Sequence, residues 1–498
     1  MDINDHGFFW WASEGHEKGV AAGLLTIDSS GLIQLELHQT LPDRSGAGGI
    51  FGEKLPEEMI IAGRLKSNGH YALLTGLTAN GGRSGMISYE IFEARECLIS
   101  HKLPNIKNFS KLFISLDGLQ QWMRPGSIDY AGPPDCNEAD NNKIAVNFKL
   151  NPKDRWELDS GSIEILHDFT GHKPEGWAHS ASIGMDSSII YKPNSAATSG
   201  ELLEWFRSIQ DLLLILTNSN LTLKWPRLLW EDGENIIGAN FYFRRNNPPS
   251  YKVIWHETLL PYSRIQNSFG SMLETWISNR KNFGPGISLY LGTRRNKPLY
   301  AEHRFVNLVW GLEALDRRVD SSKCDEPKLK EKIERLKKFV ESVEGINRSD
   351  RKWLGGLLES RGTERPLSDR LRDILKPVAI GIDEEKLEKF TKTCANLRND
   401  LSHHGGEREP GDYKRFIGEI INRSDALSKL YLLLIISLLG VESDEIKRII
   451  YHDPNSNAFR VSFMNAGLIP EPDLDELFSR FKDHGPAPDP SDEEELTA

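Results

Sequence analysis

The spacing of apolar residues changes near Thr198, and this change constrains the fold more than any other feature of the chain. Before it, short segments alternate apolar and polar residues; "GLIQLELH" places Ile33, Leu35 and Leu37 on one side, the period-two pattern of a half-buried strand. The segments "HYALLTGL", "MISYEIFEA", "KLFISLDGL" and "KIAVNFKL" are also strand-like, with Gly, Asn and Ser clusters between segments. The first part of the chain is therefore predicted to be an antiparallel sheet or a barrel.

A helix interrupts the predicted strands near residues 200–217. The segment "TSGELLEWFRSIQDLLLILT" begins with Thr198 and Glu201, the two residues of a capping box, and continues with apolar residues at helical spacing. Strand-like segments follow in "GANFYFRR" and "YKVIWHETL". We therefore place the end of a β-rich N-terminal domain near residue 265.

From about residue 265 the spacing is mostly helical. The segment "YAEHRFVNLVWGLEALDRRV" carries four apolar residues on one face: Phe305, Leu308, Leu312 and Leu315. The charged "EPKLKEKIERLKKFVESV" is predicted to be its solvated antiparallel partner, and further helices are expected in "LSDRLRDIL", "DEEKLEKFTKTCANLRNDLSHH" and an apolar stretch reaching Leu439. The expected fold class is α+β: residues 1–265 β-rich, 266–299 a connecting segment, 300–455 a helical bundle, and 456–498 an extension with a disordered acidic tail.

Length and charge limit the functions open to the chain. Its 498 residues exceed what one core organises, and 39% hydrophobic and 27% charged residues are ordinary for globular proteins. The net charge of −11 gives no general attraction to a polyanion, so contact with nucleic acid requires a local basic patch. The best candidates are "GTRRNKP", with Arg294, Arg295 and Lys297, and the pair Arg244 and Arg245.

Cysteine usage and hydropathy favour a cytoplasmic protein with no membrane partner. The four cysteines are far apart and lack zinc-binding spacing, as expected of free thiols in a reducing compartment. The N-terminus lacks the basic region and apolar core of a secretion signal. The most apolar run, "LYLLLIISLLGV", has twelve residues, short of the roughly 20 that cross a bilayer. It is expected to be a buried helix, in the core or at a dimer interface.

The stretch "TKTCANLRNDLSHHGG" is the strongest candidate for an active site. Apolar residues at steps of three and four form a buried seam: Leu387, Phe390, Cys394, Leu397 and Leu401. Away from this seam, Arg398 offers a planar guanidinium suited to phosphate, and His403 an imidazole suited to proton transfer. Such a pair cleaves RNA without a metal: a base deprotonates a 2′-hydroxyl, the oxygen attacks the adjacent phosphorus, and the guanidinium stabilises the developing charge.

The helical rotation separates these two side chains. In an ideal helix Arg398 and His403 diverge by about 140°. They converge on one phosphate if the last turn loosens before Gly405, or if two such helices pack across a dimer. His404 also has a suitable spacing from Arg398, but the pattern Arg, Asn399, three residues, His is met by His403.

A helical bundle that contains "RNDLSH" resembles the HEPN domains, whose signature is Arg, a polar residue that is often Asn, and His. With "FVNLVWGLEAL" and a strand-rich N-terminal region, the chain is similar to the ApeA-type anti-phage proteins. The resemblance implies a metal-independent endoribonuclease without a cofactor, which acts on RNA as a homodimer with a composite site. It implies catalysis by Arg398 and His403 with support from Asn399, and Glu313 near the site. Because such a nuclease is toxic when active, restraint by the N-terminal region and a phage-derived trigger are expected.

Several alternatives stay open at this point. The pattern of an Arg, four to six residues and a His is also met by Arg64 with His70 and by Arg95 with His101, so this pattern alone does not identify a nuclease. The stretch is also compatible with a solvated helix end, with a non-catalytic module that binds RNA or nucleotide, and with a scaffold that dimerises through the apolar C-terminal helix. Metal-dependent hydrolysis is disfavoured because the chain has no HExxH motif or clustered carboxylate and His residues.

Overall fold

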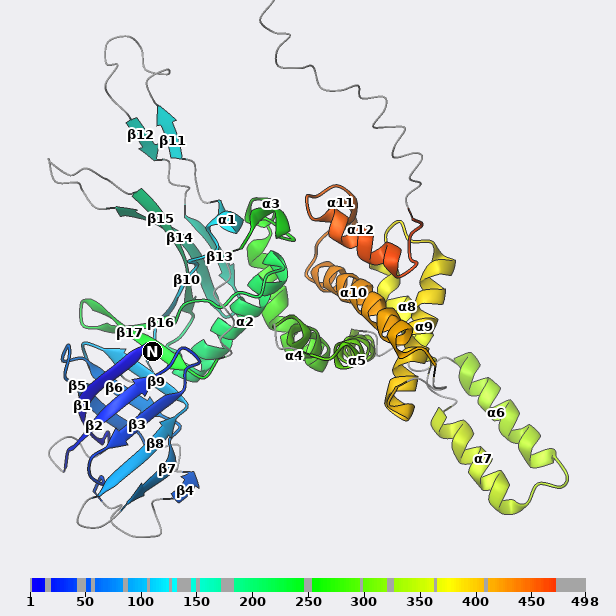
Figure 1. Cartoon of the computed structure of the whole chain (residues 1–498), viewed down its shortest axis with the longest axis horizontal. Helices are drawn as coiled ribbons and strands as arrows, with labels where there is room; N and C mark the ends of the chain where they lie inside the picture. The colour runs from blue at the N-terminus through cyan, green and yellow to red at the C-terminus, as the bar shows by residue number, and fades with distance from the viewer. Residues whose placement is uncertain are drawn as a thin grey trace, which may run out of the picture. The chain divides into compact units, whose positions relative to one another are not determined.

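The computed structural model describes two compact units, Met1–Asn279 and Arg280–Ala498 (Figure 1). The described residues are 2–13, 19–42, 51–54, 59–83, 88–104, 108–124, 128–131, 145–148, 153–171, 183–245, 253–295, 299–319, 327–361, 365–406 and 411–471. Within them, no helix is long and apolar enough to cross a membrane.

The first unit is built on one antiparallel sheet of fifteen described strands. Their order across the sheet is β13 (Asp154–Leu158), β14 (Gly161–Gly171), β15 (Ile183–Pro193), β10 (Lys111–Ser115), β16 (Arg227–Asp232), β17 (Asn235–Phe243), β9 (Glu96–Ser100), β6 (Tyr71–Thr75), β5 (Ile61–Leu65), β1 (Ile3–Trp11), β2 (Ala21–Ile27), β3 (Ile33–Leu37), β8 (Tyr89–Ala94), β7 (Thr78–Arg83) and β4 (Phe51–Lys54). The short strands β11 (Ile128–Ala131) and β12 (Ala145–Phe148) pair separately. The predicted β-rich antiparallel region is confirmed.

Strand β3 shows why the alternating pattern is reliable in this unit. Ile33, Leu35 and Leu37 are fully buried, whereas Gln34 and Glu36 on the opposite face are not. The strand pairs with β2 on one side and β8 on the other. Since successive side chains point to opposite faces, one apolar face is enough to fix which side meets the core.

Helix α2 (Ser199–Thr217) packs on the sheet and begins as predicted. Both hydrogen bonds of its capping box are present: the Glu201 N–H donates to Thr198 Oγ1 at 3.3 Å, and the Thr198 N–H donates to Glu201 Oε2 at 2.8 Å. Its aromatic side chains contact two strands, because Trp205 stacks on Tyr191 and Phe206 packs against Phe243. The short helices α1 (Gln120–Met123) and α3 (Tyr262–Ile265) also belong to this unit.

The predicted strand in "YKVIWHETL" is wrong. Its described part forms the 3-10 turn η2 (Trp255–Glu257). The chain then bonds to a helix and a side chain instead of a neighbouring strand: the Leu260 N–H donates to the Leu216 carbonyl, and Trp122 Nε1 donates to the Leu260 carbonyl. A short apolar segment can thus be buried without pairing in a sheet.

Helix α4 (Phe269–Arg294) continues across the division between the units and bends at Gly284. Gly284 has φ 54 and ψ −140, and Pro285 follows it. Because Pro285 has no N–H, the carbonyl of Lys281 lacks its usual helical donor. Arg318 Nη1 supplies one at 3.0 Å, and the Cβ of any larger residue at Gly284 would meet this guanidinium at 2.4 Å.

The second unit is helical, as predicted. It contains α5 (Ala301–Val319), α6 (Pro327–Ser342), α7 (Arg348–Arg361), α8 (Leu367–Leu375), the 3-10 turn η4 (Lys376–Val378), α9 (Glu384–His404), α10 (Tyr413–Leu438), α11 (Ser443–Tyr451) and α12 (Ser456–Asn465). Helix α5 packs against α8, α9 and α10, and α12 packs against α10 and α11. The predicted face of α5 is fully buried: Phe305, Leu308, Leu312 and Leu315.

Two predicted packing relations are resolved within this unit. The apolar stripe of α10 is buried inside its own chain, which makes it core and not a free dimer interface: Leu432, Leu433, Ile435 and Ile436. Helix α6 is paired mainly with α7 in a helical hairpin, so its predicted pairing with α5 is wrong. The acidic tail predicted to be disordered falls in residues 472–498, outside the described residues.

Candidate active site

Helix α9 is defined by local signals at both ends. The Asp383 carboxylate accepts hydrogen bonds from the N–H groups of Glu385 and Lys386, and Glu384 and Glu385 lie in the positively polarised first turn. Gly405 ends the helix in the left-handed conformation, with φ 72. The predicted seam is buried at Leu387, Phe390, Cys394 and Leu397, while Leu401 is half-buried.

The last turn of α9 is not loosened. The helix is regular through His404, and the Gly405 N–H donates to the Leu401 carbonyl at 3.2 Å. Arg398 and His403 of one chain therefore keep the helical divergence of about 140° and a separation of roughly 7.5 Å along the axis. The His403 side chain is exposed, and that of His404 lies outside the described residues. The sequence predicted that Arg398 and His403 meet either through a loosened last turn or across two subunits. The structure is compatible with the second arrangement.

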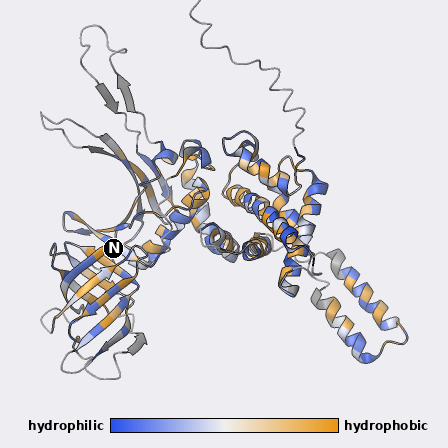
Figure 2. Ribbon diagram, viewed as in Figure 1, coloured by the Kyte–Doolittle hydropathy of each residue, from blue (hydrophilic) through white to orange (hydrophobic). Residues whose placement is uncertain are grey.

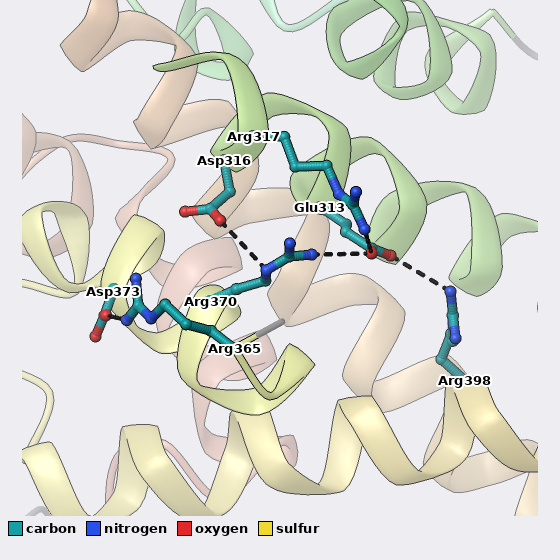
Figure 3. A network of polar contacts seen from close by, with 7 residues as sticks. All are labelled: Glu313, Asp316, Arg317, Arg365, Arg370, Asp373 and Arg398. Carbon is teal, nitrogen blue, oxygen red and sulfur yellow. Dashed lines mark hydrogen bonds and ion pairs between the residues drawn. The ribbon is translucent and has the colours of Figure 1, made fainter. Parts of the chain in front are cut away.

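Arg398 is held in one orientation by neighbours on two helices. Its Nη1 donates to Asn399 Oδ1 at 3.0 Å. Its Nη2 donates to Glu313 Oε2 at 3.3 Å, as Figure 3 shows. The Arg398 side chain is 24% exposed, and its Nε is buried with no hydrogen-bond partner among the described residues. The guanidinium is thus fixed at the surface of the bundle, where a phosphate can reach it.

Glu313 of α5 is the centre of this network. Its Oε1 accepts from Arg317 Nη2 and from Arg370 Nη1, both at 3.1 Å, while its Oε2 faces Arg398 (Figure 3). Arg370 of α8 is only 8% exposed and has a second carboxylate, Asp316, at 3.9 Å. Glu313 thus lies within ion-pair distance of three guanidinium groups, from α5, α8 and α9. A guanidinium is also the side chain best suited to bind a phosphodiester.

The sequence located part of this cluster. It placed Glu313 near Arg398 and Asn399, and the structure brings these three residues together. It missed Arg370 and Asp316. The spacing of Glu313 and Asp316, one turn apart on α5, was the available signal. No local pattern shows that an arginine of α8 is buried against them, because that contact depends on how α5 and α8 pack.

The predicted basic patch is only partly described. Arg294 is the last residue of α4, and Arg295 follows it. Burial lowers the pKa of the half-buried Arg295. Lys297 lies outside the described residues. Arg245, the second candidate, has its guanidinium carbon 3.3 Å from the ring centroid of Trp225 and donates to the Leu223 carbonyl at 2.8 Å. Burial lowers the pKa of Arg245 to about 10. These contacts give Arg245 a structural role, so its presence needs no nucleic-acid ligand to explain it.

Two family models match the chain. The model for ApeA N-terminal domain 1 matches residues 6–276, more than half of the chain, and the model for the Apea-like HEPN domain matches residues 306–445. The chain belongs to the ApeA-type HEPN family of anti-phage defence proteins. No curated protein and no solved structure matches it. The HEPN match includes Glu313, Arg370, Arg398 and His403, so the cluster lies in the HEPN domain of a defence protein. Among the residues that the structure describes, no group of three or more His, Cys, Asp or Glu is placed to hold a metal ion.

Proposed function

We propose that this ApeA-type protein is a metal-independent endoribonuclease that acts in abortive infection. The observation that carries the proposal is the guanidinium of Arg398, which Asn399 and Glu313 hold in place on the same helix as the exposed His403. An arginine held by two neighbours loses little further freedom when it binds a phosphate. In this role Arg398 binds the scissile phosphate, Asn399 orients Arg398, and Glu313 positions it.

The proposed reaction uses two copies of the chain. His403 of the partner subunit accepts the proton of the RNA 2′-hydroxyl, and the 2′ oxygen attacks the phosphorus. The bond from phosphorus to the 5′ oxygen breaks, and the leaving oxygen takes a proton from water, while the His403 imidazolium returns its proton to the solvent. The products are a 2′,3′-cyclic phosphate and a 5′-hydroxyl. The partner is required because α9 directs Arg398 and His403 of one chain apart.

The test is RNA cleavage by the purified full chain. Arg398→Ala and His403→Ala should each abolish cleavage while the circular dichroism spectrum is unchanged. Two matched controls should keep full activity: Arg415→Ala removes an exposed arginine at the start of α10, and His452→Ala removes an exposed histidine at the end of α11. Fragments with 2′,3′-cyclic phosphate ends, formed equally in EDTA, support the proposal. Undiminished cleavage by the double variant at Arg398 and His403, or loss of cleavage in EDTA, overturns it.

A non-catalytic module that binds RNA or nucleotide is the second candidate. One observation favours it: Arg398 Nη2 already donates a hydrogen bond to Glu313. This contact is compatible with a site that binds an anion and does no chemistry. It predicts RNA binding that Arg398→Ala weakens, with no cleavage by any preparation. A scaffold that dimerises through α10 is disfavoured because the apolar stripe of that helix is buried within one chain.

A further inference from the structure

The hairpin of α6 and α7 is inserted in the sequence between the two helices that carry Glu313 and Arg370. In the sequence, α5 ends at Val319, six residues after Glu313, and α8 begins at Leu367, three residues before Arg370. The hairpin lies between these two helices in the chain, and α6 and α7 pack chiefly on each other (Figure 1). Its two connections therefore start from the helices that carry Glu313 and Arg370.

The hairpin buries little of its own apolar surface. Among the described side chains of α6 and α7, only Ile333 is buried. Phe339 is 64% exposed and Trp353 is 65% exposed, and Figure 2 shows apolar residues along both helices. Exposed apolar side chains gathered on one surface element can form a binding surface, whereas a single exposed ring needs no such explanation.

The hairpin is basic although the chain is acidic. Residues 327–361 contain ten Lys and Arg and six Asp and Glu, a net charge of +4, whereas the whole chain carries −11. Lys332, Arg335 and Phe339 follow at steps of three and four, so they share one face of α6, and all three are exposed. On α7 Lys352 and Trp353 are both exposed but point in different directions, and the charged residue one turn before Trp353 is Asp350. Positive side chains beside exposed rings match a single-stranded nucleic acid, whose phosphates they pair with and whose bases they stack on.

Two glycines next to Trp353 support an external ligand. Gly355 and Gly356 lie inside α7, where each glycine costs about 1 kcal/mol relative to alanine. A Cβ at either position would meet nothing within 4 Å. Packing within the described residues therefore gives no reason for these glycines. Gly356 is one turn after Trp353, and its missing side chain leaves room beside the indole for a base.

We propose that the α6–α7 hairpin is an RNA-binding surface that holds an unpaired segment of the RNA that the Arg398 site cleaves. The proposal rests on the proposed function, since it supplies the substrate class of the same domain. The charge of the hairpin favours RNA over a second copy of the same surface, because two hairpins of net charge +4 that face each other across a two-fold axis would repel.

The binding assay uses a fluorescent 2′-O-methyl oligouridine, whose blocked 2′ oxygen cannot attack, so that binding is measured without cleavage. Trp353→Ala in the full chain should weaken binding about tenfold, the typical loss of one stacked base. The double substitution Lys332→Glu with Arg335→Glu should also weaken binding. It should reduce the slope of log affinity against log salt by about 1.4, because each phosphate contact on a single strand contributes about 0.7.

Two control variants are compared with the hairpin variants, and the oligomeric state and RNA cleavage are measured on the same preparations. Phe8→Ala removes a ring that is 60% exposed in the other unit, and Lys447→Glu reverses an exposed charge on α11; neither should change binding. Binding by the hairpin variants equal to that of the wild type overturns the proposal. So does a hairpin variant that alters the oligomeric state by light scattering and leaves RNA affinity unchanged, since that result assigns the surface to a protein partner.

Cleavage of unmodified RNA by the same preparations separates the two proposals. If the wild-type chain does not cleave RNA but Trp353→Ala weakens binding, the hairpin inference stands and the nuclease proposal fails. If Arg398→Ala abolishes cleavage while the hairpin variants bind and cleave as the wild type does, the nuclease proposal stands and the hairpin inference fails.

Discussion

Replacing Glu313 with alanine removes a carboxylate that three arginines share. The largest loss is at Arg370, which is 8% exposed and then has only Asp316, at 3.9 Å, as a described carboxylate partner. Removing one partner of a buried ion pair costs about 3–5 kcal/mol. Because Glu313 is itself 18% exposed and Asp316 is retained, we expect the lower end for this pair, about 3 kcal/mol. Arg317 is 46% exposed, so its pair adds less than about 1 kcal/mol.

The loss should appear in the second unit alone. The full chain has two units and will not unfold in one step, so a single midpoint is a poor measure. Hydrogen exchange of peptides from α5 and α8, in increasing urea, reports the unfolding of this unit directly. We expect Glu313→Ala to lower its free energy of unfolding by about 3–4 kcal/mol, and Glu313→Gln to lower it less, because the amide oxygen still accepts a hydrogen bond.

Glu384→Ala is the matched control. Glu384 pairs with Lys376 on the surface, where both side chains are more than half exposed, and its removal should leave hydrogen exchange unchanged. If Glu313→Ala behaves like Glu384→Ala, then the network around Glu313 does not hold Arg370 and Arg398 in place, and the positioning role assigned to Glu313 is wrong.

Other predictions concern the buried tyrosines and the bend in α4. Gly311→Ala should destabilise the second unit by about 1–3 kcal/mol, because the new Cβ would lie 2.9 Å from the hydroxyl oxygen of Tyr431. Adding Tyr431→Phe to this variant should restore part of the lost stability, measured by urea unfolding of the second unit. Tyr431→Phe alone should stabilise the unit by about 1 kcal/mol, since that hydroxyl is buried without a hydrogen-bond partner among the described residues. Burial raises the pKa of Tyr431 and of Tyr290, so the folded state favours the protonated phenols. Their contribution to stability is complete below about pH 10 and is lost as the pH rises further. The urea concentration that unfolds the second unit should therefore fall less steeply for Tyr431→Phe than for the wild type between about pH 9 and pH 11. Arg318→Ala leaves the Lys281 carbonyl without its donor and should increase hydrogen exchange on both sides of the bend.

The features that the sequence predicts well are those set by neighbouring residues. Asp383 and Gly405 bound α9 because an N-cap carboxylate and a left-handed glycine act within one turn. The capping box of Thr198 and the alternation in β3 are equally local. The placement of Glu313 near Arg398 came from the family resemblance and not from any local pattern.

The features that the sequence misses depend on contacts between distant segments. The strand order places β1 between β5 and β2, and β10 between β15 and β16, which alternation cannot specify. The helical pattern of α6 shows an apolar face but not whether α5 or α7 covers it. Arg370 looks like a surface arginine in "LSDRLRDIL" until the packing of α8 on α5 buries it beside Glu313. Whether a side chain is buried depends on the segment that packs against it, and the sequence of one segment does not encode that neighbour.

The composite site is tested most directly by mixing two inactive variants. Arg398→Ala and His403→Ala chains, each inactive alone, are unfolded together and refolded so that subunits exchange, and RNA cleavage is measured. If Arg398 of one subunit acts with His403 of the partner subunit, mixed dimers contain one intact pair and cleavage returns, to about a quarter of wild-type activity for random pairing with two equivalent pairs per dimer. If the mixture shows light-scattering evidence of exchanged dimers and no cleavage above its inactive components, Arg398 and His403 do not act across the subunits and the mechanism is wrong.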